Sequence, residues 1–241
     1  IIVDETTSTN DYLKAMASNF TPRDNFTAIM AKRQTKGRGQ RDNSFYSSEG
    51  ESLTFSFILF PKQLPVADVF AIQTLISLSL HDWFSQYADQ CRIKWPNDMM
   101  LGNKKGCGVL IENALAGSNV KHSIIGIGIN IAQTTFPTNI AHRATSLKMH
   151  NPNFVEKPGL ELCKELLACI KHRYESDWNQ PENLLAAYNQ LLYRLDEEAL
   201  YQVGEEIFTG IIRFVDAAGM LHLEQNGRLQ PYRFKEVSMI S

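Results

Sequence analysis

The sequence predicts an α+β fold, in which helices cover a largely antiparallel sheet and a small all-β unit follows. Apolar segments in the middle of the chain are joined by short links, which favour antiparallel neighbours because a parallel crossover needs about a dozen residues or more. Stretches with helical spacing of apolar residues lie on both sides of these segments. Beyond residue 195, short apolar runs alternate with glycines, which is typical of small β-barrels.

The composition is that of an ordinary globular protein, with 44% hydrophobic and 21% charged residues in a chain of 241. No stretch approaches the roughly 20 uninterrupted apolar residues of a membrane span. The net charge of −2 gives no general reason to expect a nucleic-acid partner, which would show as a basic excess. We therefore expect neither a membrane nor a nucleic acid among the partners.

The cysteines and histidines indicate neither a disulfide framework nor a metal centre. Cys91, Cys107, Cys163 and Cys169 lack C-x-x-C spacing and lie within apolar patterns, so we expect buried thiols in a reducing cytoplasm. The histidines form no zinc-binding pattern. No signal peptide precedes Ile1, and a cytoplasmic location is expected.

The first part of the chain predicts helices and strands in turn. The residues from Ser8 to Asp11 favour the start of a helix whose apolar side chains follow at helical spacing. Thr27 to Ala31 is a short apolar strand, and Leu53 to Phe60 alternates like a half-buried strand before it becomes fully apolar. Pro65 precedes a long helix from Val66 to about Tyr87.

Three apolar segments separated by tight connections come next, and they predict antiparallel strands. The segments are Arg92 to Trp95, Gly108 to Glu112 and Ser123 to Ile131, and the connectors are Asn103 to Gly106 and Leu115 to Lys121. The residues that follow, Thr134 to Met149, show no clear period and are expected to form a loop.

Two further helices and a change of pattern complete the chain. One helix enters through Pro158 and is expected to bury one face, made of Leu160, Cys163, Leu167, Ile170 and Tyr174. Another runs from about Pro181 to about Arg194. Because glycine-punctuated short strands follow, we expect a domain at residues 1–194 and a small β-barrel domain at residues 195–241.

A cationic segment with two glycines follows the first predicted strand. Its cations are Lys32, Arg33, Lys36, Arg38 and Arg41. Gly37 and Gly39 flank Arg38, so the backbone can approach a ligand closely while the guanidinium presents a fork suited to phosphate or carboxylate. The segment is either a loop that binds a small anion or a surface turn whose charges are solvated.

A second stretch, Lys94-Trp95-Pro96-Asn97-Asp98, ends a strand abruptly. Proline removes a donor from the strand ladder, and Asn-Asp favours a turn. Lys104 and Lys105 follow closely, so an acid and an ammonium group can meet at one end of the sheet. This arrangement suits a phosphate and ribose site; alternatively, Asp98 caps the turn and the lysines are solvated.

The third stretch is Gly126-Ile127-Gly128-Ile129-Asn130. Glycines that alternate with isoleucines in a strand imply that something packs closely against one face. This is not the dinucleotide fingerprint, whose glycines lie in a turn between a strand and a helix. Asn130 either contacts a polar ligand at the strand end or is a turn residue.

Taken in this order, the stretches resemble the biotin protein ligase family. The family's motifs are S-T-N, Q-x-x-G-R-G-R-R-G-R, K-W-P-N-D, K-K-x-x-G and G-x-G-x-N. Here they correspond to Ser8 to Asn10, Gln34 to Asn43, Lys94 to Asp98, Lys104 to Gly108 and Gly126 to Asn130. The resemblance runs from residue 8 to about residue 130, and motifs in a fixed order are more specific than any one of them.

The resemblance implies a class II aminoacyl-tRNA synthetase-like mixed sheet with helices, plus a small C-terminal β-barrel. It also implies a two-step reaction that uses biotin, ATP and Mg²⁺. The biotin carboxylate attacks the α-phosphate of ATP to give biotinyl-5′-adenylate, and a lysine of a biotin carboxyl carrier domain then attacks this anhydride. Negative charge develops on the phosphate during activation, so fixed cations should contribute most.

By the same resemblance, Lys105 and Arg38 are the expected catalytic residues, and Asp98 orients either the ribose or Lys105. The expected biotin-binding residues are Ser8, Thr9, Asn10, Gln34, Gly37, Arg38, Gly39, Lys105 and Gly108. The expected residues for ATP and the adenylate are Arg38, Arg41, Lys94, Trp95, Asn97, Asp98 and Asn130. Thr134 to Met149 corresponds to the loop that closes over adenine. No protein side chain is assigned to magnesium, which should accompany the ATP phosphates.

The chain departs from the family pattern mainly in the cationic segment. Gln40, Asp42 and Asn43 stand where the family often has Arg, Gly and Arg, and Phe45 stands where it has Trp. Two of these changes remove a cation and Asp42 adds an opposing charge. Phosphate contacts are therefore weakened there, which leaves open whether the pyrophosphate is held elsewhere. Lys235 also replaces a frequent glycine.

Two other functions stay open. A lipoate protein ligase shares the fold and the adenylate chemistry, but its R-R-x-S-G-G-G stretch is missing and Q-T-K-G-R-G stands in that place. A biotin-sensing regulator that binds DNA would carry an N-terminal helix-turn-helix domain, for which the residues before Ser8 leave no room. The oligomeric state is open too, a homodimer included.

Overall fold

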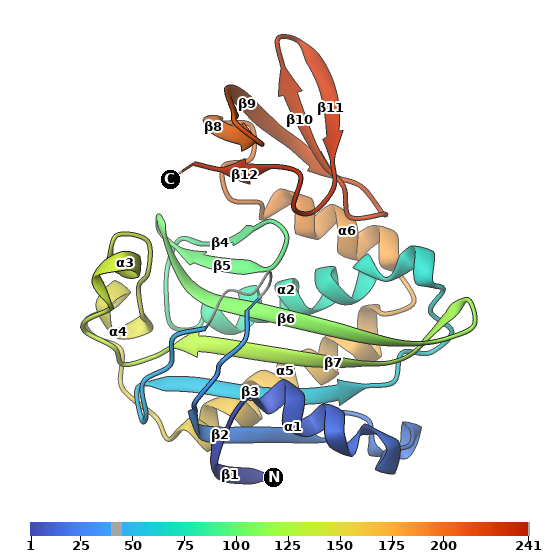
Figure 1. Ribbon diagram of the computed structural model, residues 1–241, viewed down its shortest axis with the longest axis vertical. Coiled ribbons are helices and arrows are strands. Elements are labelled where there is room, and N and C mark those ends of the chain that lie inside the picture. The colour runs from blue at the N-terminus through green and yellow to red at the C-terminus, as the bar shows by residue number, and fades with distance from the viewer. Residues whose placement is uncertain (40–44, 241) are drawn as a thin grey trace.

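The computed structural model describes residues 1–39 and 45–240 (Figure 1). Its main sheet has seven strands in the order β1-β2-β3-β7-β6-β5-β4. β1 and β2 pair in parallel, and the remaining neighbours pair antiparallel, as the short connections predicted. The strands are β1 Ile2–Thr6, β2 Ala28–Gln34, β3 Ser52–Leu59, β4 Cys91–Lys94, β5 Asp98–Leu101, β6 Lys104–Ala116 and β7 Asn119–Asn130.

Helices cover both faces of the main sheet, so the predicted α+β class is confirmed. On one face α1 (Thr9–Met16) packs against β3 and β7. On the other face lie α2 (Phe70–Phe84) and α5 (Gly159–Asp177), and α6 (Pro181–Gln190) packs against α2 (Figure 1). The connections contain the 3₁₀ helices Ala17–Asn19, Pro22–Asp24 and Val66–Asp68, and the short helices α3 Thr138–Ala141 and α4 Leu147–His150.

Strand β3 is buried along nearly its whole length because both of its faces are covered. Phe55 and Phe57 face the main core between the sheet, α2 and α5. Ile58 faces the opposite way and joins Leu13 of α1 and Ile124 of β7 in a smaller cluster. The sheet therefore has one face that is filled mainly by apolar side chains and another that α1 covers only in part. The second face is where the polar residues of the sequence motifs gather.

A second sheet follows α6, in the order β11-β10-β9-β8-β12. Its antiparallel strands are β8 Glu198–Val203, β9 Glu206–Val215, β10 Leu221–Gln225, β11 Arg228–Tyr232 and β12 Ser238–Met239. The predicted small β-barrel is present as an antiparallel sheet that is not closed, because within the described residues β11 and β12 are two separate edges and do not pair. The division into domains at 1–194 and 195–241 stays a prediction.

The cationic loop begins later than predicted. β2 continues to Gln34 because β1, which the sequence did not indicate, pairs with it. Lys32 Nζ lies 2.8 Å from Asp4 Oδ1, and Arg33 Nη1 lies 2.9 Å from Glu5 Oε2. These two cations are therefore neutralised on an edge of the sheet, and their assignment to the loop is wrong.

Three other boundaries also differ from the prediction. The predicted connector at Asn103 to Gly106 lies largely within β6. The strand starts at Lys104 because it pairs there with β5, which the sequence did not indicate. The predicted loop from Thr134 to Met149 contains α3 and α4. In α5, Leu160 is 38% exposed, since the buried stripe runs through Leu162 and Leu166 instead.

The expectation of free, buried thiols is confirmed for most of the cysteines. Cys91, Cys107 and Cys163 are buried and Cys169 is half-buried, and all of them are free. Burial raises the pKa of Cys91 and Cys163 to about 12. Among the described helices, none is long and apolar enough to cross a membrane.

Candidate active site

A row of paired residues crosses the main sheet and forms the floor of the site. The strand registers place Lys94 opposite Asp98, Asp98 opposite Gly108, Gly108 opposite Gly128, and Gly128 opposite Thr54. Directly paired residues in antiparallel strands point to the same face of a sheet. Motifs that are far apart in the sequence are therefore brought into one line by strand pairing alone.

A β-bulge adds Lys105 to this row. The pairing of β5 with β6 shifts between Met99 and Met100, so Gly106 is an extra residue in β6. Without this insertion, Lys105 and Gly108 would point to opposite faces of the strand, because side chains alternate. A bulge can redirect a side chain in this way. A Cβ added at Gly108 would lie 3.1 Å from Lys105 Nζ, which places the ammonium directly over the row.

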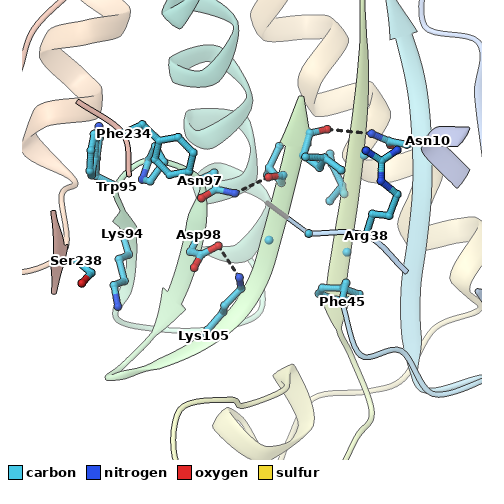
Figure 2. A pocket seen from close by; sticks show the side chains of 18 of the residues that line it. Asn10, Arg38, Phe45, Lys94, Trp95, Asn97, Asp98, Lys105, Phe234 and Ser238 are labelled. Carbon is cyan, nitrogen blue, oxygen red and sulfur yellow. Dashed lines mark hydrogen bonds and ion pairs between the residues drawn. The ribbon is translucent and has the colours of Figure 1, made fainter. Parts of the chain in front are cut away.

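Lys105 and Asp98 form an ion pair on this floor. Lys105 Nζ lies 2.6 Å from Asp98 Oδ1, and neither side chain is fully buried. Figure 2 shows the ammonium held beside the carboxylate and facing the cavity. The predicted meeting of an acid and an ammonium group is therefore present. Asp98 was expected to orient either the ribose or Lys105, and this geometry favours Lys105.

A cavity of about 280 Å³ lies over the row; we call it the glycine cavity. The main sheet supplies its floor, with Gly108, Gly126 and Gly128. The second sheet and the segment around it close one side with Tyr201, Phe234, Ser238 and Met239. Trp95 lies between the two parts, since its ring meets that of Phe234 edge-on and its Nε1 donates to the Gly219 carbonyl over 3.1 Å (Figure 2).

The glycines of β7 are required by what packs on them, as their alternation with isoleucine predicted. A Cβ at Gly126 would lie 2.1 Å from Asn10 Oδ1. A Cβ at Gly128 would lie 2.6 Å from the ring of Phe45, the residue that stands where the family has tryptophan. Both distances are too short for any side chain, so these glycines create the space that Asn10 and Phe45 occupy.

A buried network of uncharged polar groups forms one end of the glycine cavity. Gln34 Oε1 accepts a hydrogen bond from the Thr9 amide over 2.8 Å. Ser56 Oγ lies 2.7 Å from Thr9 Oγ1 and donates to Asn10 Oδ1 over 2.6 Å. Ser8 is buried beside them at the start of α1, where its side chain makes no capping hydrogen bond. These groups can recognise a neutral polar ligand through hydrogen bonds and shape.

Arg38 lies on the other side of the cavity from Lys105, with its guanidinium turned toward Asn10 (Figure 2). It forms ion pairs with Asp11 and, over 3.3 Å, with Glu112. Glu112 also accepts from Asn10 Nδ2 over 3.0 Å. Burial would raise the pKa of Glu112, but this hydrogen bond and the nearby cations lower it overall. The two expected catalytic cations are therefore not side by side in this structure.

A second cavity of about 430 Å³ adjoins the first; we call it the cation cavity. Both cavities are lined by Phe45, Lys94, Asp98, Lys105 and Met239. The second also has basic side chains from distant segments, Arg143 and Arg194, and aromatic ones, Tyr46 and Phe136. Lys105 is thus positioned where the glycine-floored space meets a second one that adds Arg143 and Arg194.

Several other predicted residues have a structural partner. Asn97 Nδ2 donates to the Val109 carbonyl over 2.6 Å, which ties the turn after β4 to β6. Asn130 Nδ2 donates to the Thr145 carbonyl over 2.9 Å and so anchors the segment after β7. Gly37 does not line the cavity; a Cβ there would lie 2.5 Å from the Phe45 carbonyl oxygen. Gly39 does line it. Arg41, Gln40, Asp42 and Asn43 lie outside the described residues.

The sequence missed the cavity residues that tertiary structure supplies. Arg143 lies in the segment assigned to the loop over adenine but was not singled out, Arg194 belongs to no motif, and only the folded chain brings both to the cavity that Lys105 lines. The contribution of the second sheet had no local signal either. One departure noted in the sequence, Lys235, has a structural explanation. Its φ of 83° lies in the left-handed region, which explains why glycine is frequent at this position in the family.

The described residues contain no group of three or more His, Cys, Asp or Glu side chains that could hold a metal ion. Among those that line the two cavities, Asp98 is the one carboxylate, and it is paired with Lys105. This donor set fits a magnesium ion that enters on nucleotide phosphates and keeps several waters rather than one held by a cage of side chains.

Comparisons with known proteins agree with the geometry. A Bacillus spizizenii protein named bifunctional ligase/repressor BirA is 32% identical over 177 residues, which are 72% of this chain and 53% of that relative. This chain thus spans about half the length of that relative. A Mycobacterium tuberculosis protein named biotin–[acetyl-CoA-carboxylase] ligase is 24% identical over 94% of this chain and 84% of its own length.

A solved structure of biotin protein ligase from Aquifex aeolicus in complex with biotin and ATP superimposes with a TM-score of 0.80. It is 26% identical, and the match covers 100% of this chain and 97% of that one. Residues 2–130, which contain every motif discussed above, match the family described as biotin/lipoate A/B protein ligase. The chain therefore belongs to the biotin/lipoate A/B protein ligase family.

Proposed function

We propose that this chain is a biotin protein ligase, which activates biotin with ATP and transfers it to a lysine of a biotin carboxyl carrier domain. The observation that carries the proposal is the Lys105–Asp98 pair at the junction of the glycine cavity and the cation cavity. A neutral bicyclic ligand with a carboxylate tail suits the first cavity, and a nucleotide triphosphate suits the second. The Aquifex ligase bound to biotin and ATP supports this pairing of ligands.

In the first step, a biotin carboxylate oxygen attacks the α-phosphorus of MgATP, and the bond from that phosphorus to the β-phosphate oxygen breaks. Negative charge then builds on the α-phosphate and on the departing pyrophosphate. Lys105 is placed to stabilise this charge, and Asp98 keeps its ammonium group in position. A fixed cation in a partly dehydrated site is more effective than a solvated one because it needs no reorganisation during the reaction.

At the other end of biotin, the ureido group would meet the uncharged network of Ser8, Thr9, Asn10 and Gln34. In the second step, a neutral lysine amine of the carrier attacks the acyl carbon, and AMP leaves. The second sheet borders the glycine cavity, so we propose residues 1–194 as the catalytic domain and 195–241 as a smaller domain that helps to enclose the adenylate. We expect both steps to take place in the cytoplasm.

Arg38 has a conditional role in this proposal. To reach the carboxylate or the α-phosphate, its guanidinium has to leave Asp11 and Glu112, and a bound anion offers the competing charge. Arg38→Ala should then lower adenylate formation strongly while biotin-free stability changes little, since surface ion pairs contribute about 0–1 kcal/mol. Unchanged pyrophosphate release from Arg38→Ala would remove this residue from the mechanism.

The direct test is incubation with biotin, MgATP and a carrier domain, followed by mass measurement of the carrier. Addition of one biotin supports the proposal, and the reaction without ATP is the control. Thermal melting distinguishes the lipoate alternative, because the true ligand stabilises the folded state. A rise with lipoate but not with biotin would contradict the proposal.

The name of the Bacillus relative includes a repressor activity. Neither cavity gives information about DNA binding. A biotin-dependent gel shift with operator-like DNA would test that activity separately. Its result leaves the ligase proposal unchanged, since adenylate formation is measured without DNA.

A further inference from the structure

The hydrogen-bond network at the α1 end of the glycine cavity depends on two residues that none of the sequence motifs contains. Ser56 lies in β3 and is completely buried, with 0% of its surface exposed. Glu112 lies in β6. Neither is among the described residues that line the two cavities. Any effect that they have on a ligand therefore passes through the residues that do line the glycine cavity, Thr9, Asn10 and Gln34.

The side-chain amide of Asn10 has a fixed orientation. Its Nδ2 donates to Glu112 Oε2 over 3.0 Å and to the Leu110 carbonyl over 3.4 Å, on the side of β6 (Figure 2). An ionised carboxylate and a carbonyl can only accept hydrogen bonds, so the reverse orientation of the amide would place oxygen against oxygen. Asn10 Oδ1 is therefore turned toward Ser56.

Glu112 keeps this orientation when a ligand binds. Burial opposes its ionisation, but the hydrogen bond from Asn10 and the charges of Lys14 and Arg38 hold its pKa below the ordinary value. Its two oxygens have different partners: Oε2 accepts from Asn10, whereas Oε1 lies 3.3 Å from Lys14 Nζ and 3.3 Å from Arg38 Nη2. Movement of Arg38 toward a bound anion would therefore free Oε1 and leave the bond to Asn10 in place.

The orientation of Asn10 decides the direction of the hydrogen bonds of Ser56. The Ser56 hydroxyl lies 2.6 Å from Asn10 Oδ1 and 2.7 Å from Thr9 Oγ1, but it has one proton. Because the Asn10 oxygen can only accept, the Ser56 proton goes to Asn10. The short contact between the two hydroxyl groups then requires the proton of Thr9. Thr9 therefore donates to Ser56 and not to Gln34 Oε1, which is 3.2 Å away.

This order determines what the cavity wall offers to a ligand. The Thr9 hydroxyl has only lone pairs left, so it is an acceptor. Gln34 Oε1 accepts from the Thr9 amide over 2.8 Å, which leaves the Nε2 hydrogens of Gln34 as donors. An acceptor beside a donor matches a ring in which an N–H group is bonded to a carbonyl, as in a cyclic urea. A ring oxygen in place of that N–H would face the Thr9 oxygen without a proton between them.

We propose that Glu112 and Ser56 are positioning residues that fix the Thr9 hydroxyl as an acceptor, so that the glycine cavity selects a ligand with an N–H group at this point. This inference rests on the proposed function, because it explains how the ureido ring of biotin is distinguished from a ring of the same shape. The effect runs from Glu112 through Asn10 and Ser56 to Thr9. A site built to hydrogen-bond an N–H group strongly rejects an analogue that lacks it.

The test is isothermal titration of biotin and of its two cyclic carbamate analogues, in each of which one ureido N–H is replaced by oxygen. The wild type should bind biotin about 10²-fold more tightly than the weaker analogue, since one hydrogen bond is exchanged for a repulsive contact. In Ser56→Ala, the Thr9 proton is free to turn toward the ligand oxygen, so this ratio should fall about tenfold. Glu112→Leu should lower the ratio too, because the Asn10 amide loses its main acceptor.

Two further variants separate this effect from general damage to the site. Glu112→Gln keeps an oxygen that can accept from Asn10 and should rescue the ratio that Glu112→Leu loses. Lys14→Gln is the matched control, because Lys14 pairs with Glu112 Oε1, its side chain is 61% exposed, and it does not bond to Asn10. A merely structural role would weaken the binding of biotin and of the carbamates alike and would leave the ratio unchanged.

The outcomes distinguish this inference from the proposed function. A wild-type ratio in Ser56→Ala, or an equal fall in Lys14→Gln, would overturn the inference. If Glu112→Leu does not fold, Ser56→Ala decides the question, since it removes a single oxygen atom. A wild-type protein that binds biotin and the carbamates equally well would also overturn the inference, whereas one that does not bind biotin at all would overturn the proposed function.

Discussion

The glycine cavity and the cation cavity share Lys105 but are built on opposite principles. In the glycine cavity, Asn10, Ser56 and Thr9 satisfy one another through short hydrogen bonds, and glycines leave exact room for them. In the cation cavity, Arg143 and Arg194 form no close ion pair with a carboxylate among the described residues, although Tyr193 and the charge of Glu197 raise the pKa of Arg194. One site is complete before a ligand arrives, whereas the other is completed by its ligand.

This difference teaches how recognition and activation are divided. A preformed neutral network selects a ligand by shape and hydrogen bonds, because a ligand whose own polar groups find no partner in it loses their hydrogen bonds to water. Unpaired cations, by contrast, interact more strongly as negative charge builds up, which is what acceleration of a reaction requires. The two cavities should therefore respond differently to the same perturbation.

The largest effect is expected where the cavities meet. Lys105→Ala should lower the rate of adenylate formation about 10²–10³-fold, the usual cost of removing one stabilising group from a charged transition state. Biotin should still raise the melting temperature, since the network around Asn10 is untouched. Pyrophosphate release measures the first effect and thermal melting the second.

Lys104→Ala is the matched control for this variant. Lys104 is the preceding residue, and its Nζ donates to the Ala141 carbonyl over 3.3 Å without lining either cavity. Its activity should stay within a few-fold of the wild type. Equal losses in both variants would indicate a general disturbance of β6 and would refute a special role for Lys105.

The next largest effect is expected from adding a single methyl group to the glycine cavity, which should leave the cation cavity unchanged. Gly126→Ala places a Cβ 2.1 Å from Asn10 Oδ1, so the network has to break. We expect biotin affinity to fall about tenfold or more, with a loss of about 1–3 kcal/mol in the free energy of unfolding. The affinity for MgATP should change less. Isothermal titrations with each ligand measure the two affinities.

Gly108→Ala is the counterpart of Gly126→Ala. Its added Cβ meets the end of the flexible Lys105 side chain at 3.1 Å, and the ammonium can move away. Adenylate formation should therefore suffer more than biotin affinity. If Gly126→Ala left biotin affinity intact, the proposed ureido end of the cavity would be wrong.

The two cavities also differ in how far the sequence revealed them. Local motifs indicated the glycine cavity, because Gly126, Gly128 and the residues from Ser8 to Asn10 are tied to strand and helix positions. The convergence of Lys94, Asp98 and Gly108 could be expected only in outline. Its actual form depends on register, and a bulge at Gly106 decides that Lys105 joins the row. A bulge of this kind has no reliable local signature.

The cation cavity was visible in the sequence only in part: the motifs and the resemblance indicated Lys94, Asp98, Lys105, Asn130 and the segment 134–149, but no motif contains Arg194. Arg194 and Arg143 look like ordinary surface cations, and it is the packing of distant segments around Lys105 that gives them a common task. The fold shows a similar limit. Periodicity predicted the long helices, but β1 was missed because it is an exposed edge strand with little apolar pattern. Non-local pairing also decides that the second sheet stays open within the described residues rather than closing as a barrel.

A smaller effect concerns pH and comes from Lys94, which lines both cavities. Burial and neighbouring cations lower the pKa of Lys94 from its ordinary value of 10.5, so its charge is lost at a lower pH than for a solvated lysine. As pH rises toward the ordinary lysine range, the KM for ATP should therefore increase before it would for a solvated lysine, by several-fold toward the roughly tenfold limit of one lost contact. Biotin affinity should stay level over the same range.

Lys94→Arg tests this assignment, since a guanidinium stays charged throughout the accessible range. The alkaline rise in KM should be absent in this variant. Arg143→Gln should move the rise to higher pH, because removing a neighbouring cation restores the pKa of Lys94 toward its ordinary value. A rise that is identical in all three proteins would place the titrating group elsewhere.

The smallest effect is expected from Glu112, the acid that joins Arg38 to the glycine cavity. Glu112→Gln keeps an oxygen that can accept from Asn10 but removes the charge that faces Arg38 and Lys14. The loss in the free energy of unfolding should be about 0.5–1 kcal/mol, since these pairs are partly exposed. The folded-state pKa of Glu112 is below its ordinary value, so its charge stabilises the fold above the unfolded pKa, and this contribution disappears as pH falls through the folded one. Urea unfolding should therefore separate the wild type from the variant at neutral pH and bring them together in acid, once Glu112 is protonated in the folded state. A difference that persists in acid would mean that Glu112 does not act through its charge, and its ion pairs with Arg38 and Lys14 would then contribute nothing to stability.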